Sequence, residues 1–204
     1  MTTYVILIRG INVGGKNKIP MAELKSHLEA HGFARVTTYI QSGNVILKSD
    51  LDAATLAAQV ETLLATRFKL DSPQIKVLAL TRKQLQRVIE HKPDGFGEEP
   101  DKYHSDAIFL MGIDAQATLA IFNPREGVDQ VWAGDGVIYS QRLSAQRTKS
   151  RLNKIMADPA YKLMTIRNWN TTTKLLDLAL QADADRPLAV SILSVSLNRT
   201  QTLA

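Results

Sequence analysis

Apolar positions in the first half of the chain follow the periods of strands and helices in turn. Short runs rich in branched residues predict strands, and apolar residues three and four positions apart predict helices. The predicted order is strand, helix, strand, strand, helix, strand, helix, over Tyr4–Arg9, Pro20–His31, Val36–Ile40, Val45–Lys48, Asp52–Arg67, Ile75–Leu80 and Thr81–His91. Gly43 and Asn44 allow the tight turn that joins the middle strands into a hairpin.

The second half of the chain repeats this order of elements. It predicts a strand, a short helix, two hairpin strands, a basic helix, a strand and a last helix, over Asp106–Met111, Asp114–Phe122, Val128–Trp132, Val137–Ser140, Lys149–Met156, Leu163–Arg167 and Thr171–Leu180. Asn170 is the predicted N-cap of the last helix. We therefore interpret the chain as an internal duplication.

The order βαββαβ is typical of a ferredoxin-like unit, an antiparallel sheet with two helices on one face. The predicted fold class is α+β, with two ferredoxin-like βαββαβ subdomains. We place the N-terminal subdomain at 1–92, a linker containing Pro and Gly at 93–103, and the C-terminal subdomain at 104–182. The atypical tail 183–204 is expected to lie outside the compact fold and is a candidate for disorder.

The topology of the first unit predicts where its loops meet. A crossover helix makes the first and second strands parallel, so both end at the same edge of the sheet. We therefore expect the loop Arg9–Ile19 and the turn Gln41–Asn44 to be neighbours at a potential binding site.

Composition narrows the chemistry and the setting. The 204 residues include no Cys, which excludes disulfides, thiolate zinc sites and cysteine nucleophiles. The chain opens directly on a strand pattern without a leader, and no apolar run approaches the length of a membrane span. We expect a cytoplasmic protein with no membrane partner.

Positive charge is concentrated in one segment. Between Arg142 and Lys174 lie eight bases and one acid, whereas the rest of the chain carries 17 bases and 19 acids. Such an excess attracts polyanions, although a solvated basic face without a partner has the same pattern.

The loop after the first strand matches the phosphate-loop pattern GxxxxGK from Gly10 to Lys16. Asn17 stands where that motif needs Ser or Thr, and the helix begins only at Pro20, so a nucleotide-hydrolysing phosphate loop is disfavoured. Successive glycine amides beside Arg9 and Lys16 still suit an anion. A glycine turn with solvated lysines explains the same residues.

Two sequence runs carry a resemblance to a known family. The run Arg9–Met21, followed by Thr38–Asn44, resembles the domain of unknown function 1697 (DUF1697) family, and Met164–Thr171 resembles its second signature. The resemblance spans about residues 3–179. It implies a bacterial-type cytosolic protein with a ferredoxin-like portion, and no known substrate, cofactor or catalytic residue.

The second signature also has a physical interpretation. Arg167 and Asn168–Asn170 precede a helix whose free amides favour an anion, and an exposed Trp169 would stack a base. In the alternative, Trp169 is buried and Asn170 only caps the helix.

No metal site or other cofactor is expected. His27 and His31 lie one helical turn apart, but neither an HExxH pattern nor a third ligand accompanies them.

Hypotheses from different classes stay open. The chain is a binding module for a phosphate-bearing ligand, nucleic acid included, or an enzyme acting on a small anionic metabolite or nucleotide, or a protein-interaction or dimerisation module. The sequence identifies no nucleophile or base and leaves the oligomeric state open. The candidate ligand-binding residues are Arg9, Asn12, Gly14, Gly15, Lys16, Asn17, Gln41, Ser42, Asn44, Arg147, Arg151, Arg167, Asn168, Trp169 and Asn170.

Overall fold

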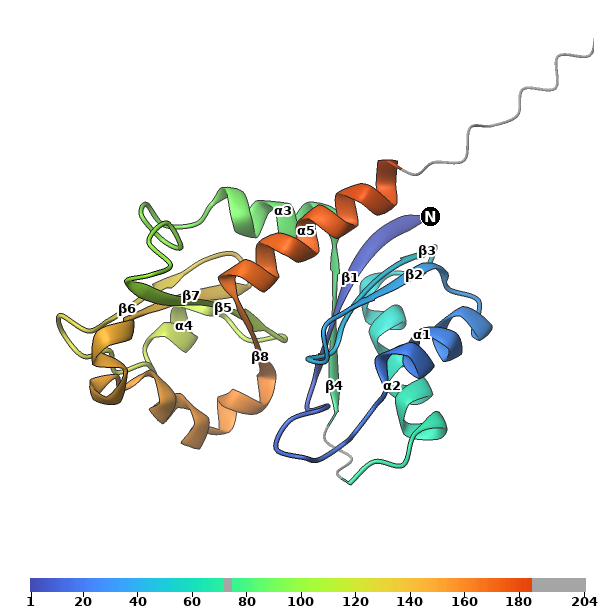
Figure 1. Cartoon of the computed structure of the whole chain (residues 1–204), viewed down its shortest axis with the longest axis horizontal. Helices are drawn as coiled ribbons and strands as arrows, with labels where there is room; N and C mark the ends of the chain where they lie inside the picture. The colour runs from blue at the N-terminus through green and yellow to red at the C-terminus, as the bar shows by residue number, and fades with distance from the viewer. Residues whose placement is uncertain (72–74, 185–204) are drawn as a thin grey trace, which may run out of the picture.

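Two four-stranded antiparallel sheets with the same strand order organise the protein (Figure 1). The computed structural model describes residues 1–71 and 75–184. The predicted α+β class with two ferredoxin-like subdomains is confirmed. Within these described ranges, no helix is both long and apolar enough to cross a membrane.

The first sheet has the strand order β2-β3-β1-β4. Its elements are β1 (Thr2–Arg9), α1 (Met21–Ala30), β2 (Ala34–Tyr39), β3 (Asn44–Ser49), α2 (Ala53–Arg67) and β4 (Lys76–Thr81). Tyr4, Ile6 and Ile8 belong to the core packed with α1 and α2, whereas Val5 and Leu7 belong to a second core. Successive side chains of a strand point to opposite faces, so the continuous apolar run at residues 4–8 of β1 fits a strand that is buried on both faces.

The second sheet repeats this order as β6-β7-β5-β8. Its elements are β5 (Tyr103–Leu110), α4 (Ala115–Leu119), β6 (Asp129–Ala133), β7 (Val137–Leu143) and β8 (Met164–Asn168). The strands therefore repeat the topology of the first unit as predicted, although α4 is only 5 residues long.

The basic helix predicted at Lys149–Met156 is wrong. The chain instead makes three 3-10 turns, η1 (Ser144–Lys149), η2 (Leu152–Ala157) and η3 (Pro159–Leu163). Ser150 between the first two is extended, with φ −60° and ψ 142°. This extended residue interrupts any continuous helix, and the amide of Arg151 that follows it donates to the Asp129 carboxylate of β6 at 2.8 Å.

Two helices lie between the sheets and join them. They are α3 (Arg82–Glu90) and α5 (Trp169–Ala184), and each follows the last strand of its unit (Figure 1). Leu85 of α3 and Leu175 of α5 share a core with the inner faces of both sheets. The buried Tyr139 hydroxyl of β7 donates to the Val88 carbonyl of α3 at 2.6 Å. The two halves therefore share one apolar interior.

The segment 93–103, which was predicted to be a linker, packs against the second half of the protein through Phe96. Phe96 is fully buried, and its ring makes edge contacts with Trp132, Tyr139 and Trp169. Burial of an aromatic ring anchors the connection between the halves.

Both ends of α5 differ from the prediction. The helix begins at Trp169, and Asn168, not Asn170, caps it by accepting from the Thr171 amide at 2.7 Å. At its other end Asp183 pairs with Arg82 and Lys48, so the first residues of the expected tail belong to the compact fold. Residues 185–204 lie outside the described residues.

Two glycines of the connecting segment give a matched test of this packing. Gly97 has φ +75°, and a Cβ there would overlap the Trp169 indole, whereas Gly95 has φ +73° and open space. Gly95→Ala should cost about 1 kcal/mol of unfolding free energy from backbone strain alone. Gly97→Ala should cost at least about 2 kcal/mol more in urea denaturation, since the clash is added. Equal losses would show that the indole does not confine Gly97.

Candidate functional site

The loop after β1 and the β2–β3 turn are neighbours, as predicted. The Ile8 amide donates to the Gly43 carbonyl at 2.8 Å, and Asn12 Nδ2 donates to the Gln41 carbonyl at 2.8 Å. Asn44 Nδ2 closes the turn by donating to the Tyr39 carbonyl and to Ser42 Oγ.

Two asparagine side chains hold the glycine-rich loop together. Asn12 donates to the Ile19 carbonyl and accepts from the Ile19 amide at 2.7 Å. Asn17 donates to the Gly10 carbonyl at 2.8 Å and exchanges hydrogen bonds with Asp71. These amides replace backbone pairing in an irregular segment. Asn12 and Asn17 were predicted to bind a ligand, but their side chains already make hydrogen bonds within the protein. Gly14, Gly15 and Lys16 form the exposed tip of the loop.

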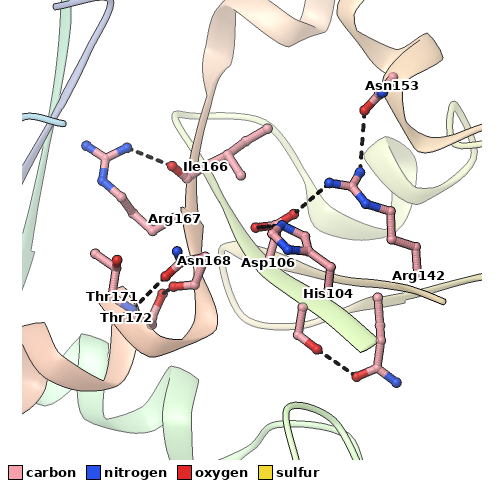
Figure 2. A network of polar contacts seen from close by, with 11 residues as sticks. His104, Asp106, Arg142, Asn153, Ile166, Arg167, Asn168, Thr171 and Thr172 are labelled. Atoms are coloured by element: carbon pink, nitrogen blue, oxygen red, sulfur yellow. Dashed lines mark hydrogen bonds and ion pairs between the residues drawn. The ribbon is translucent and has the colours of Figure 1, made fainter. Parts of the chain in front are cut away.

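Arg167 of β8 joins the two halves from inside. Its side chain points from β8 toward the first sheet (Figure 2). Its guanidinium donates to Asn44 Oδ1, to Thr165 Oγ1 at 3.0 Å and to the carbonyls of Ile8, Ser42, Gly43 and Ile166 at 3.1, 3.0, 3.2 and 2.8 Å. The residue is 7% exposed. Arg167 therefore has the structural function of holding β8 against the end of β1 and the β2–β3 turn.

All of these acceptors are uncharged. Among the described residues, no carboxylate lies within ion-pair distance of Arg167. Burial lowers the pKa of Arg167 to about 10. It stays protonated at neutral pH, and because the folded pKa lies below the unfolded one, burial opposes folding at every pH below about 10. The hydrogen bonds offset this cost. Because their acceptors are neutral, they do not cancel the charge, and the electrostatic potential at the junction is positive.

Arg9 lies at the same junction, but its hydrogen-bonding groups are only partly used. Arg9 Nε donates to the Met164 carbonyl at 2.9 Å, and the guanidinium carbon lies 5.2 Å from the centre of the Tyr161 ring. Within the described part of the chain, its two Nη groups have neither an acceptor nor a carboxylate partner. Arg9 is thus positioned by the second half and keeps donors free.

A cleft of about 400 Å³ opens between the two halves at this point. Its lining comes from the dark blue loop after β1 and the orange segment before β8, among others, and Figure 1 shows these two segments. One wall comes from Ile8–Ile11, Val13 and Ser42, and the other from Met156, Tyr161 and Met164–Arg167. Both runs that carry the family resemblance therefore contribute to one cleft.

The remaining predicted residues lie elsewhere. A separate hollow of about 100 Å³ is lined by Asn168, Trp169 and Asn170. Trp169 is buried and packs against Phe96, as the alternative interpretation of the second signature predicted. Arg151 lines a third hollow beside η2, and Arg147 is exposed on η1. The predicted residues therefore do not form one site, and only Arg9, Ser42 and Arg167 line the cleft.

Sequence reasoning missed part of one wall of the cleft and a polar network. Tyr161 and Met156 carry no motif, and only their nearness to the second signature could have indicated them. On β5 and β7, His104 contacts Asp106 at 3.1 Å, and Asp106 lies 4.0 Å from Arg142 (Figure 2). Burial raises the pKa of Asp106 although His104 and Arg142 oppose the shift. The part of the chain that the structure describes holds no cluster of metal-ligating side chains.

The structural function of Arg167 predicts a large loss on its removal. Arg167→Met should reduce the free energy of unfolding by about 3 kcal/mol, because buried acceptors at Asn44 and Ile8 lose their donor. Urea denaturation measures this loss. Arg147→Met, which removes an exposed cation, should change it by less than about 0.5 kcal/mol. Similar small changes in both variants would contradict the proposed junction.

Comparisons with known proteins agree with this architecture. A solved structure of the conserved bacterial protein SP0830 from Streptococcus pneumoniae aligns with a TM-score of 0.73 and 29% sequence identity, covering 87% of this chain and 98% of that one. No curated protein matches the chain. The model of the family described as Protein of unknown function (DUF1697) matches residues 1–139, which include the first signature and end before the second. Since this match covers well over half of the sequence, the chain belongs to the DUF1697 family.

Proposed function

We propose that the protein binds a phosphate-bearing or other anionic ligand in the cleft between its two halves. The observation that carries this proposal is Arg9, which lines the cleft. Its Nε and guanidinium face are held by Met164 and Tyr161, while its Nη groups have no acceptor among the described residues. A guanidinium positioned in this way is pre-organised for a bidentate bond to a carboxylate or phosphate.

The electrostatics of the cleft support the same proposal. Arg167 adds a buried positive charge that only neutral groups contact, and the described lining contains no acidic side chain. The exposed bases Lys16 and Lys162 lie in the segments that form the two walls. An anion arriving there meets attraction without competition from a neighbouring carboxylate.

A binding function is favoured over an enzymatic one by the composition of the lining. The described residues of the lining include neither a carboxylate nor a histidine, the groups that most often act as general acid or base. The His104 and Asp106 pair lies on a different surface, beside Arg142.

We also infer a bacterial, cytoplasmic setting. The complete absence of Cys suits a reducing compartment. The solved relative is described as a conserved bacterial protein.

Pyrophosphate provides a first probe of the anion site. At a concentration tenfold above its Kd it should stabilise the wild type by about 1.4 kcal/mol, which raises Tm by about 3–6 °C in a chain of this size. Differential scanning fluorimetry at constant ionic strength measures the shift. Arg9→Gln should abolish it and Arg147→Gln should retain it. An equal shift in both variants, or none in the wild type, would refute the proposal.

Nucleic acid is the alternative anionic partner, and salt separates it from a small ligand. A ligand held by one anionic group should bind with a shallow dependence on salt, whereas several phosphate contacts give a slope near −0.7 for each contact on a single strand. Fluorescence anisotropy of labelled RNA and DNA oligonucleotides at low and moderate salt tests this. We expect no saturable binding at moderate salt. Tight binding that falls steeply with salt would assign the site to nucleic acid.

A further inference from the structure

The cleft is lined by apolar side chains that the fold leaves uncovered. Val13 and Met156 are 67% and 60% exposed, and both lie on its lining. Ile166, also on the lining, is 36% exposed. Exposed apolar surface gathered at one place is typical of binding sites, because its contact with water is unfavourable until a partner covers it.

These residues come from three separate parts of the chain. Val13 belongs to the glycine-rich loop, Met156 to η2 and Ile166 to β8. Met156 also belongs to a residue type whose flexible side chain adapts to varied ligands. The junction of the two halves therefore brings together apolar groups that no single element presents.

The anionic anchor and the apolar groups share one cleft. Arg9 provides free donors there, while the guanidinium itself covers the Tyr161 ring. A volume of about 400 Å³ far exceeds what a lone phosphate fills, and lies in the range of sites for small organic ligands. An inorganic anion would bind to Arg9 and leave the apolar lining wet.

We propose that the ligand is a small amphipathic anion, one carboxylate or phosphate group joined to an apolar body. This inference rests on the proposed anion-binding function. The anionic group binds the Nη atoms of Arg9, and the apolar body covers Val13 and Met156. Both parts are needed for tight binding, because the anionic group orients the ligand and the contact of the apolar body supplies most of the affinity.

An extended polyanion fits these observations less well. Gly14, Gly15 and Lys16 are exposed but do not line the cleft, and Lys154 lines the hollow beside η2. The bases therefore do not form a track through the cleft that successive phosphates would follow.

Isothermal titration calorimetry with inorganic phosphate, phenyl phosphate and 1-naphthyl phosphate tests this ligand class. For the wild type, 1-naphthyl phosphate should bind at least about tenfold more tightly than inorganic phosphate, with phenyl phosphate between them. Val13→Ser/Met156→Ser should lose this gain and keep the affinity for inorganic phosphate. Arg9→Gln should weaken all three ligands. Ile121→Ser/Leu180→Ser, which changes two exposed apolar residues outside the cleft, should match the wild type.

The outcomes separate the two proposals. If inorganic phosphate binds through Arg9 but the aromatic esters bind no more tightly, the ligand is a simple anion and this inference fails alone. If the gain survives in Val13→Ser/Met156→Ser, the apolar contact lies elsewhere and the inference also fails. If no ligand responds to Arg9→Gln, the proposed function fails with it.

Discussion

A buried cation that has no counter-ion among the described residues is the constraint on which the rest of this structure depends. Arg167 reaches from the second sheet into the first and meets only neutral acceptors, chiefly backbone carbonyls and the side chain of Asn44. Burying a charge is costly unless hydrogen bonds satisfy it, so the acceptors must stay where they are. The end of β1, the β2–β3 turn and β8 are therefore held together, and α3 and α5 complete the shared core.

This constraint explains why the two signatures contain so many polar residues with structural functions. Asn12 and Asn17 shape the loop, Asn44 and Arg167 lock the junction, and each uses its hydrogen-bonding groups within the protein. What they leave free is informative. Among the described residues, the Nη donors of Arg9 have no acceptor, and the apolar lining of the cleft beside it remains exposed. The structural residues therefore shape a cleft in which Arg9 supplies the unpaired donors.

Local patterns predicted the order of strands and helices along the chain, because hairpin turns and apolar periods act over a few residues. The start of the helix predicted at Thr81–His91 is local in the same way, since Thr81 and Gln84 form a capping box at the start of α3. Long-range contacts were not readable. The backbone is extended at Ser150 where a basic helix was expected, and the Arg151 amide beside this break donates to the distant Asp129 carboxylate, a contact that no local pattern indicates. The acceptors of Arg167 in the first half, Ile8 and Ser42–Asn44, lie more than 120 residues away, so its sequence context suggested a ligand. Asn168 and Asn170 are equally good caps by composition, and packing decides between them.

The arginine side-chain NMR spectrum of ¹⁵N-labelled protein tests the central claim most directly, because it reports on Arg9 and Arg167 in one experiment. Arg167→Lys and Arg9→Gln assign the two Nε–H signals. On titration with phenyl phosphate, we expect the Arg9 signal to shift saturably because the anion binds there. The Arg167 signal should shift little and stay protected from exchange with water, because this side chain is buried. Rapid exchange at Arg167 together with an unmoved Arg9 signal would contradict both the buried junction and the anion site that it builds.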